Sequence, residues 1–316
     1  MIGDLTGTII SPETVRPSIL PLQNQQSMSH HMLQEIEENQ RATVSHLSEG
    51  IGQRSFLDIR KLDDAAGYIE EKFSSLGLTV ERQAFTYRGN TYWNIIGAQK
   101  GHEKPILVIG AHYDTVVGTP GADDNASGVA VLLELARLSV HMRYKRPVRF
   151  VAFCLEEPPV FYTSRMGSFV YAKSLRDQGV QVYGMVSLEM LGYFSEEEDS
   201  QFYPFPLFRL CYPNKGNFIA FVGNLTSRAF TQDLKRAFKS VSDFPVESLN
   251  SPSIIPGVDF SDHRSFWKMG YQALMITDTA FYRNPHYHAP GDTCETLDYK
   301  KMAELVRGLH SAMSSL

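Results

Sequence analysis

The feature that most constrains the fold is a series of short apolar runs, several of which lead directly into a histidine or a carboxylate. The runs span residues 93–98, 106–111, 148–155, 182–188, 218–222 and 273–277. Around them, apolar residues recur at helical spacing near 32–47, 63–76, 126–140, 168–177, 230–241 and 302–313. Strands that alternate with helices predict an α/β fold with a mostly parallel central sheet.

Composition excludes several other classes of protein. Of the 316 residues, 43% are hydrophobic and 21% are charged, which is typical of a globular chain and not of a disordered or collagen-like one. The formal net charge of −5 argues against a nucleic-acid partner, which usually needs a basic surface. No apolar run approaches the roughly 18 residues that a membrane span requires. The three cysteines are far apart and form no CxxC pair, so neither a disulfide framework nor a thiolate zinc site is expected.

The N-terminal region carries little structural signal. Residues 1–28 are rich in Ser, Pro, Gln and Asn, and we expect a loose arm. The first residues contain an early acid, Asp4, and no apolar core, so they do not resemble a secretory signal. A cytoplasmic location is therefore the default prediction, although a secreted protein whose signal had been removed would look the same.

Residues of metal-binding types follow the ends of several predicted strands. They are His112 and Asp114 after 106–111, Glu156 and Glu157 after 148–155, Glu189 after 182–188, and Asp278 after 273–277, with His286 and His288 in the loop beyond. Ligands bind beyond the carboxyl ends of the strands in parallel α/β sheets, so these side chains are expected at one edge. Histidine and carboxylate bind zinc-like ions. The pattern therefore predicts a metal site.

A glycine-rich loop, GTPGADDNASG at 118–128, supplies two more acids, Asp123 and Asp124. Its glycines allow the backbone to approach closely, and its acids precede a predicted helix whose start favours negative charge. Both acids could be capping residues only. Their position between two strand ends that carry metal-type residues favours a role at the metal site.

Taken together, these motifs resemble the co-catalytic zinc exopeptidases, a family that holds bacterial leucine-type aminopeptidases, glutamate carboxypeptidase and the glutaminyl cyclases. The resemblance rests on AHYDT at 111–115, GADDNASG at 121–128, Glu156 and Glu157, LEMLGY at 188–193, SDH at 261–263 and YHAPGDT at 287–293. The motifs occur in the family's order, from about residue 45 to the end. The resemblance implies a single α/β catalytic domain at 29–316, with a mixed, mostly parallel sheet and helices on both faces.

The resemblance also implies a role for each matching residue. The metal ligands would be His112, Asp124 as the bridging carboxylate, Glu157, Glu189 and His288. Asp114 matches the carboxylate that orients the imidazole of His112. Glu156 matches the general base that takes a proton from water and delivers it to the leaving amine. Tyr287 is expected to donate a hydrogen bond to the oxyanion of the scissile carbonyl.

Charge arithmetic supports two divalent metal ions. Asp124, Glu157 and Glu189 carry −3, two divalent ions carry +4, and one bridging hydroxide would make the centre neutral. Two histidines and three carboxylates suit zinc, while cobalt and manganese bind similar sites. The ions would polarise the scissile carbonyl and stabilise the oxyanion.

Two positions depart from the family pattern. Many members have aspartate where this chain has Glu189, whose extra methylene changes the reach of the carboxylate. The link that precedes Gly167 is a longer, aromatic segment, PPVFYTSRM at 158–166, which we expect to shape the substrate pocket.

Other polar residues have simpler explanations. Asp278 and His286 are predicted to lie at the surface or to support the ligands without binding metal. Ser261 is predicted to cap a helix that carries Phe266 and Trp267, and the resemblance adds a role on the substrate side.

The predicted function is metal-dependent exopeptidase activity on a peptide or aminoacyl substrate, and an aminopeptidase is favoured. Five aromatic residues indicate an apolar side-chain preference: Phe161, Tyr162, Phe194, Tyr282 and Tyr287. Because no residue is identified that recognises a free amine, carboxypeptidase and dipeptidase action remain open.

Two further alternatives are weaker. The resemblance associates glutaminyl-cyclase-type cyclisation with a one-metal site that lacks the full ligand set. This chain has both His112 and Glu189, which speaks against that reaction. A binding module without catalysis is least favoured, because an acceptable residue occupies every expected ligand position. Neither a serine nor a cysteine nucleophile is indicated, and the sequence predicts no oligomeric state.

Overall fold

The structure, a computed structural model, describes residues 22–99, 105–142 and 144–316. Its centre is an eight-stranded sheet in the order β1-β2-β4-β3-β5-β8-β6-β7. The strands are β1 Thr79–Tyr87, β2 Asn90–Ala98, β3 Ile106–His112, β4 Val148–Phe153, β5 Val182–Glu189, β6 Ile219–Gly223, β7 Val246–Asn250 and β8 Ala273–Thr277. The central strands β4, β3, β5 and β8 are parallel, so their carboxyl ends meet at one edge. The pairs β1–β2, β2–β4 and β6–β8 are antiparallel, which makes the sheet mixed.

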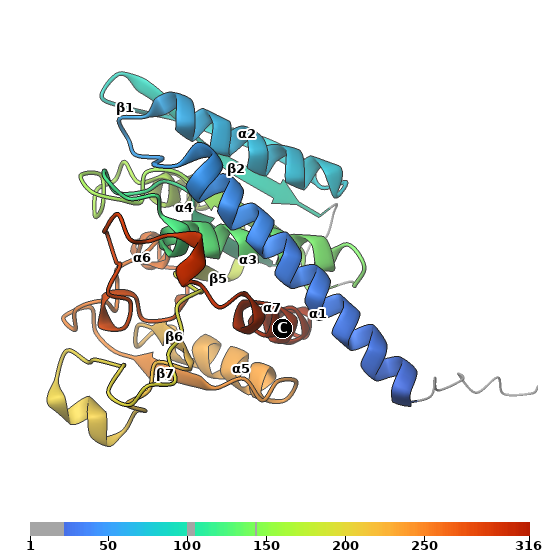
Figure 1. Cartoon of the computed structure of the whole chain (residues 1–316). Coiled ribbons are helices and arrows are strands. Elements are labelled where there is room, and N and C mark those ends of the chain that lie inside the picture. The colour runs from blue at the N-terminus through green and yellow to red at the C-terminus, as the bar shows by residue number, and fades with distance from the viewer. Residues whose placement is uncertain (1–21, 100–104, 143) are drawn as a thin grey trace, which may run out of the picture.

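Helices cover both faces of this sheet (Figure 1). The described helices are α1 Leu22–Ser45, α2 Ile59–Ser75, α3 Gly128–Ser139, α4 Gly167–Asp177, α5 Arg228–Lys239, α6 His263–Lys268 and α7 Tyr299–Ser314. Helices α2, α3 and α5 contact strands in the large core cluster, and α7 packs against α1, α3 and α5. Helices α4 and α6 pack on strands through a separate cluster that includes Phe153 and Phe266. The predicted α/β fold with helices on both faces is therefore confirmed.

Shorter helical turns connect these elements. They are η1 His46–Ile51, η2 Ala122–Ser127, η3 Pro206–Leu210, η4 Ala280–Tyr282 and η5 Cys294–Thr296. The turn η2 leads directly into α3 and includes a cis peptide bond between Asp124 and Asn125. It contains the predicted bridging residue, which the structure places against the carboxyl ends of the strands.

Burial explains which elements the sequence pattern reveals. Strand β3 is buried along its whole length, and it appears in the sequence as a continuous apolar run. Strands β1 and β7 were not predicted because they are edge strands with few buried residues, Phe85 and Val246 respectively. Their polar, half-exposed sequences lack an apolar run.

Helix boundaries differ from the predictions at three places. Helix α2 begins after Asp58 and not after Asp63. It ends at Ser75, and the chain turns away from the helix at Gly77, whose φ is 73°. Helix α6 begins after Asp262, so the prediction that Ser261 caps it is wrong by one residue. Helix α1 begins at Leu22, inside the expected arm, because its glutamines and other residues of 22–28 are compatible with a helix. Residues 1–21 of that arm lie outside the described residues.

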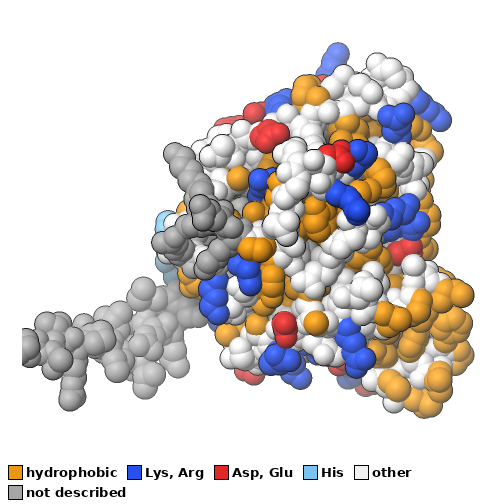
Figure 2. Space-filling model, turned by 180° about the vertical axis from the view of Figure 1, so that it is seen from behind, with side chains coloured by type: hydrophobic (Ala, Val, Ile, Leu, Met, Phe, Trp, Pro, Cys, Tyr) orange, Lys and Arg blue, Asp and Glu red, His pale blue; other side chains and the backbone are white. Residues whose placement is uncertain are grey.

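The molecule also has an apolar surface patch. Around η3, Phe205, Leu207 and Leu210 are each at least half exposed. In Figure 2, hydrophobic side chains gather at the lower right, where this segment lies. Among the described helices, none combines the length and apolar character needed to cross a membrane.

Candidate metal centre

The parallel strands bring the predicted ligands together at one edge of the sheet. His112 is the last residue of β3, and Glu189 is the last residue of β5. Glu156 and Glu157 follow β4 after a short link. Asp124 comes from η2, and His288 comes from the loop between β8 and α7. These six side chains form overlapping groups whose potential ligand atoms lie within 4.8 Å of one another in each group.

Asp124 lies between the two histidines. Its Oδ1 is 3.4 Å from Nε2 of His112, and its Oδ2 is 3.1 Å from Nε2 of His288. Glu189 Oε1 lies 3.4 Å from Nε2 of His112, and Glu157 Oε2 lies 3.4 Å from Nε2 of His288. The geometry therefore forms two half-sites, each with one histidine and one terminal carboxylate, which share Asp124.

The orientation of His112 leaves its Nε2 available as a ligand. Its Nδ1 lies 3.1 Å from the main-chain carbonyl oxygen of Asp114, which can only accept a hydrogen bond. The Nδ1–H therefore donates to this carbonyl, and Nε2 faces Asp124 and Glu189, where it could bind a metal ion. The carboxylate of Asp114 is slightly farther from Nδ1, at 3.7 Å.

Asp114 makes a second set of contacts that the sequence did not predict. Its Oδ1 and Oδ2 accept hydrogen bonds from the backbone N–H groups of Glu156 and Glu157, each at 3.1 Å. One carboxylate therefore fixes the end of β3 relative to the two glutamates that follow β4. Glu156 itself points toward the cluster, with Oε2 4.0 Å from Nε2 of His112.

The charges of the protein alone strongly perturb this cluster. Burial opposes the charged form of His112, but Glu189, Asp114 and Asp124 raise its pKa well above the usual value. Burial, together with the nearby charge of Asp124, raises the pKa of Glu157 to about 8. Burial also raises the pKa of Glu156 well above its usual range. The cluster places four carboxyl groups, those of Asp124, Glu156, Glu157 and Glu189, around only two histidines.

The donor set fits divalent cations. Among the described residues, Asp124 Oδ1 and Glu157 Oε1 are buried oxygens without a hydrogen-bond partner. Buried carboxylate oxygens are normally paired, and a cation would satisfy both of them. Imidazole nitrogen and carboxylate oxygen are zinc ligands, so His112, Asp124, Glu157, Glu189 and His288 are suited to hold such ions.

Two residues without a predicted role at the metal centre support Glu189. Ser261 donates a hydrogen bond from its hydroxyl to Glu189 Oε2 at 2.6 Å. Asn125 donates from Nδ2 to the carbonyl of Leu188 at 2.8 Å and accepts the N–H of Met190 at 3.0 Å. The chain is thus held on both sides of Glu189. The SDH and GADDNASG motifs contained both residues, but nothing in their spacing indicated these contacts.

Asp292 is a further residue without a predicted role. Its Oδ1 and Oδ2 accept the backbone N–H groups of Asp123 and Asp124, at 2.8 and 3.0 Å. The YHAPGDT motif that includes Asp292 was recognised, and only the fold shows that it contacts the loop of Asp124.

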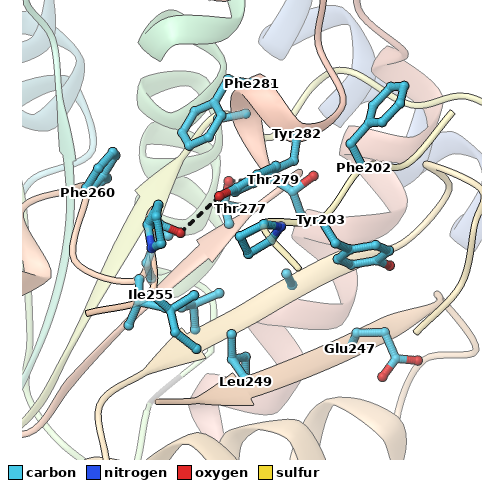
Figure 3. Close-up of a pocket in the computed structure, with 18 of the residues that line it drawn as sticks. Phe202, Tyr203, Glu247, Leu249, Ile255, Phe260, Thr277, Thr279, Phe281 and Tyr282 are labelled. Atoms are coloured by element: carbon cyan, nitrogen blue, oxygen red, sulfur yellow. Dashed lines mark hydrogen bonds between the residues drawn. The ribbon is translucent and has the colours of Figure 1, made fainter. Parts of the chain in front are cut away.

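An apolar pocket adjoins the cluster, and both Glu189 and Tyr287 line it. It encloses about 850 Å³ including its open mouth. Figure 3 shows Phe281 and Tyr282 along one side, Phe202 and Tyr203 along another, and Leu249 across the pocket from Tyr282. Tyr287 lies at the junction of pocket and cluster, with its ring stacked on that of His288 at a centroid distance of 3.8 Å.

Several other candidates lie away from the cluster. Asp278 accepts the backbone N–H groups of Tyr193 and Ala280, and it belongs to none of the metal-type groups. The ring of His286 contacts that of Tyr193. Asp123 is buried and bonds to Gly192 and Asn284. The contacts described for Asp278 and His286 are therefore structural, and neither residue belongs to the candidate metal groups of the described chain.

The predicted aromatic determinants divide into three sets. Tyr282 and Tyr287 line the pocket. Phe161 and Tyr162, from the segment 158–166, stack on each other and make edge contacts with Phe260, which lines it. Phe194 packs against Phe244 and is not among the lining residues.

The fold and site are thus those of an α/β protein with a buried histidine–carboxylate cluster at the carboxyl edge of its sheet. A model of Peptidase family M28 matches residues 94–313, and the chain belongs to this family. The protein YfbL of Escherichia coli K12, described as uncharacterized, is 45% identical over 275 residues, which cover 84% of each chain. A probable leucine aminopeptidase of Trichophyton verrucosum is 27% identical over 225 residues, 67% of this chain and 54% of the relative. The chain thus spans about half the length of that relative.

Solved structures share the fold. The zinc aminopeptidase BSAP of Bacillus subtilis has a TM-score of 0.69 at 17% identity, over 87% of this chain and 94% of that chain. A glutaminyl cyclase of Bacteroides thetaiotaomicron has a TM-score of 0.67 at 18% identity, over 89% and 98%. These neighbours carry out two different reactions on one fold, so the reaction must be argued from the site.

Proposed function

We propose that this protein is a metal-dependent aminopeptidase that removes N-terminal residues with bulky apolar side chains. The observation that carries the proposal is the position of Asp124, with one oxygen toward His112 and the other toward His288. Such a shared carboxylate suits two divalent ions, for which zinc is the favoured metal and cobalt or manganese the alternatives. His112 and Glu189 would hold one ion, His288 and Glu157 the other.

The bound ions would polarise the scissile carbonyl and make water easier to deprotonate. Glu156 takes a proton from the attacking water and passes it to the leaving amine, which requires a carboxyl group that exchanges protons readily. Asp114 keeps Glu156 in place through its bond to the Glu156 backbone N–H. Tyr287 is the candidate donor to the oxyanion, because it lines the pocket beside Glu189 and its ring stacks on that of His288.

The pocket supports the choice of an apolar side chain. Tyr203, Tyr212 and Tyr282 donate their hydroxyl groups to the main-chain carbonyls of Pro213, Ser248 and Pro256 in the surrounding wall. Their polar atoms are thereby used, and aromatic carbon remains to contact a ligand. Glu247 pairs with Lys235 at 3.5 Å, and its carboxylate points away from the pocket centre in Figure 3.

Charge supports an amino- rather than a carboxypeptidase. Among the residues that the structure describes, those that line the pocket include no lysine, arginine or histidine. A C-terminal carboxylate would therefore find no cationic side chain in this pocket, which argues against recognition of a peptide C-terminus there.

A mixed peptide panel tests the proposal. Peptides with free or blocked termini are incubated with zinc-loaded protein and followed by mass spectrometry. Stepwise loss of bulky apolar residues from free-amine peptides alone is expected. Loss from the C-terminus, ammonia loss from N-terminal glutamine, or no change in any peptide would each contradict the proposed activity.

A further inference from the structure

Arg54 is a fully buried arginine in the link between η1 and α2. It lies outside residues 94–313, which the family model matches. It contributes no ligand atom to the cluster. Its contacts nevertheless converge on the two loops that carry His112 and Asp124.

Within the described part of the chain, the guanidinium of Arg54 donates to five main-chain carbonyl oxygens. Three of these belong to the ligand loops: Tyr113 accepts from Nε at 2.9 Å, Pro120 from Nη1 at 2.9 Å and Gly121 from Nη2 at 3.0 Å. Two belong to the N-terminal segment: Leu47 and Gly52 accept from Nη1 at 2.7 and 2.8 Å. One side chain therefore joins the N-terminal segment to backbone that lies 59 to 67 positions farther along the chain.

The backbone of Arg54 adds a reciprocal link to the loop after β3. Its N–H donates to Oγ1 of Thr115 at 3.0 Å, and its carbonyl accepts the N–H of Thr115 at 3.2 Å. Together with the bond to Tyr113, this holds the residues directly after His112. Because His112 is itself aligned by the carbonyl of Asp114, a shift of this loop would move its Nε2.

Arg54 and Asp292 bind opposite kinds of backbone group in the loop that carries Asp124. Arg54 binds the carbonyls of Pro120 and Gly121, and Asp292 binds the N–H groups of Asp123 and Asp124. The backbone packs closely at this turn, because Gly121 has φ of 64° and a Cβ there would lie 2.4 Å from the carbonyl oxygen of Asp124 and 3.1 Å from Nη2 of Arg54. The position of the shared carboxylate is thus set by main-chain bonds on both sides.

Arg54 also places a positive charge beside the acidic cluster without pairing to any one acid. Burial lowers the pKa of Arg54 to about 10, while Asp292, Asp114 and Asp124 favour its charged form. The guanidinium remains protonated at neutral pH. A lysine could keep this charge, but its single nitrogen could not reproduce the planar fork that reaches several carbonyls.

We propose that Arg54 is a positioning residue that sets the spacing between His112 and Asp124 and so determines metal affinity. The inference rests on the proposed metal site, and it assigns to the N-terminal segment a part in building that site. A purely structural role would instead lower the stability of the whole fold and leave the affinity of the folded protein for metal unchanged.

The test uses the full chain and compares R54K with R137K. Arg137 is a matched control because it pairs with Glu134 and Glu35 on α3 and α1, away from the cluster. Zinc affinity is measured by competition with a chromophoric chelator, on protein that circular dichroism shows to be folded. We expect R54K to bind zinc about 10- to 100-fold more weakly than the wild type. R137K should match the wild type.

Steady-state kinetics provide a second readout at saturating zinc. With zinc restored, R54K should keep a KM near that of the wild type and show a lower kcat, because the pocket is intact while the ligands are misaligned. Unchanged zinc affinity in folded R54K would overturn the inference. If R54K does not fold, R54Q replaces it. The rise in melting temperature on adding zinc is then compared between R54Q and the wild type, and a smaller rise in R54Q is expected. A wild-type protein that binds zinc and cleaves no peptide would refute the proposed function alone.

Discussion

The hydroxyl of Ser261 donates to Oε2 of Glu189 at 2.6 Å and leaves Oε1 facing His112. The bond directs one oxygen of the longer glutamate side chain toward the proposed metal position. Replacing Ser261 with alanine should therefore weaken zinc binding at the half-site of His112 and Glu189 by about 10-fold or more. Removing the hydrogen-bond partner of a metal ligand commonly has an effect of this size. Zinc titration of S261A should separate the two sites. S265A is the control, because Ser265 bonds to Ser168 and not to a ligand; equal losses in both variants would contradict the prediction.

Glu156 and Glu157 are adjacent in the sequence and should respond differently to mutation. E156Q should lower kcat by about 10²- to 10⁴-fold, because an amide cannot take the proton, while zinc content stays at the wild-type level. E157Q should reduce zinc content, because its carboxylate faces His288. Elemental analysis after gel filtration, together with peptide turnover, distinguishes the two. Wild-type turnover by E156Q would refute the proposed mechanism.

In the proposed site Asp124 serves both half-sites, so its loss should be more severe than the loss of His288. D124A should lose both metal ions. H288A should still bind one ion at the half-site of His112 and Glu189, because that half-site keeps all its ligands. Zinc stoichiometry at matched free-zinc concentrations measures the difference. Equal stoichiometry in D124A and H288A would argue against a shared ligand.

The pocket should select side chains by size. Ala220 lines it and is almost completely buried on β6. A220F should fill part of the pocket. It should lower kcat/KM for peptides with N-terminal phenylalanine or tryptophan by about 10-fold or more, because their large side chains would no longer fit against the pocket wall. Peptides with N-terminal alanine act as the internal control and should be cleaved at nearly the wild-type rate. A uniform loss on all peptides would show a general effect on the fold.

His263 should make the fold less stable at acidic pH. Its Nε2 faces the carbonyl of Val258 at 2.9 Å, and its Nδ1 is buried without a partner among the described residues. Burial lowers the pKa of His263 to about 4, below the value near 6.5 of an unfolded chain. The folded state therefore binds fewer protons, and stability is lost as the pH falls from 6.5 toward 4.

Urea unfolding of the wild type and H263Q at pH 7 and pH 5 checks this. The wild type should lose about 2 kcal/mol more of its free energy of unfolding than H263Q between these two values. Glutamine keeps a donor for the Val258 carbonyl and does not titrate. Parallel losses in the two proteins would show that His263 does not contribute.

Local patterns in the sequence predicted much of the fold and placed the candidate ligands. Strands β3, β4, β5 and β8 are buried and apolar, so they could be recognised without knowledge of their neighbours. Because they are parallel, the residues after them had to meet at one edge. The edge strands β1 and β7 could not be recognised in this way, because their sequences are mostly polar.

The sequence by itself determined which residue types stand at the strand ends, and so that a metal centre could form. The tertiary structure decided how these residues are held: Arg54 reaches Gly121, Ser261 reaches Glu189, and Asp292 reaches Asp124. Such bonds join residues that are 67, 72 and 168 positions apart, and no local spacing encodes them. The pocket likewise assembles from loops that become neighbours only when the sheet has formed. Periodicity reports what a segment buries, whereas the partner it meets depends on the path of the whole chain.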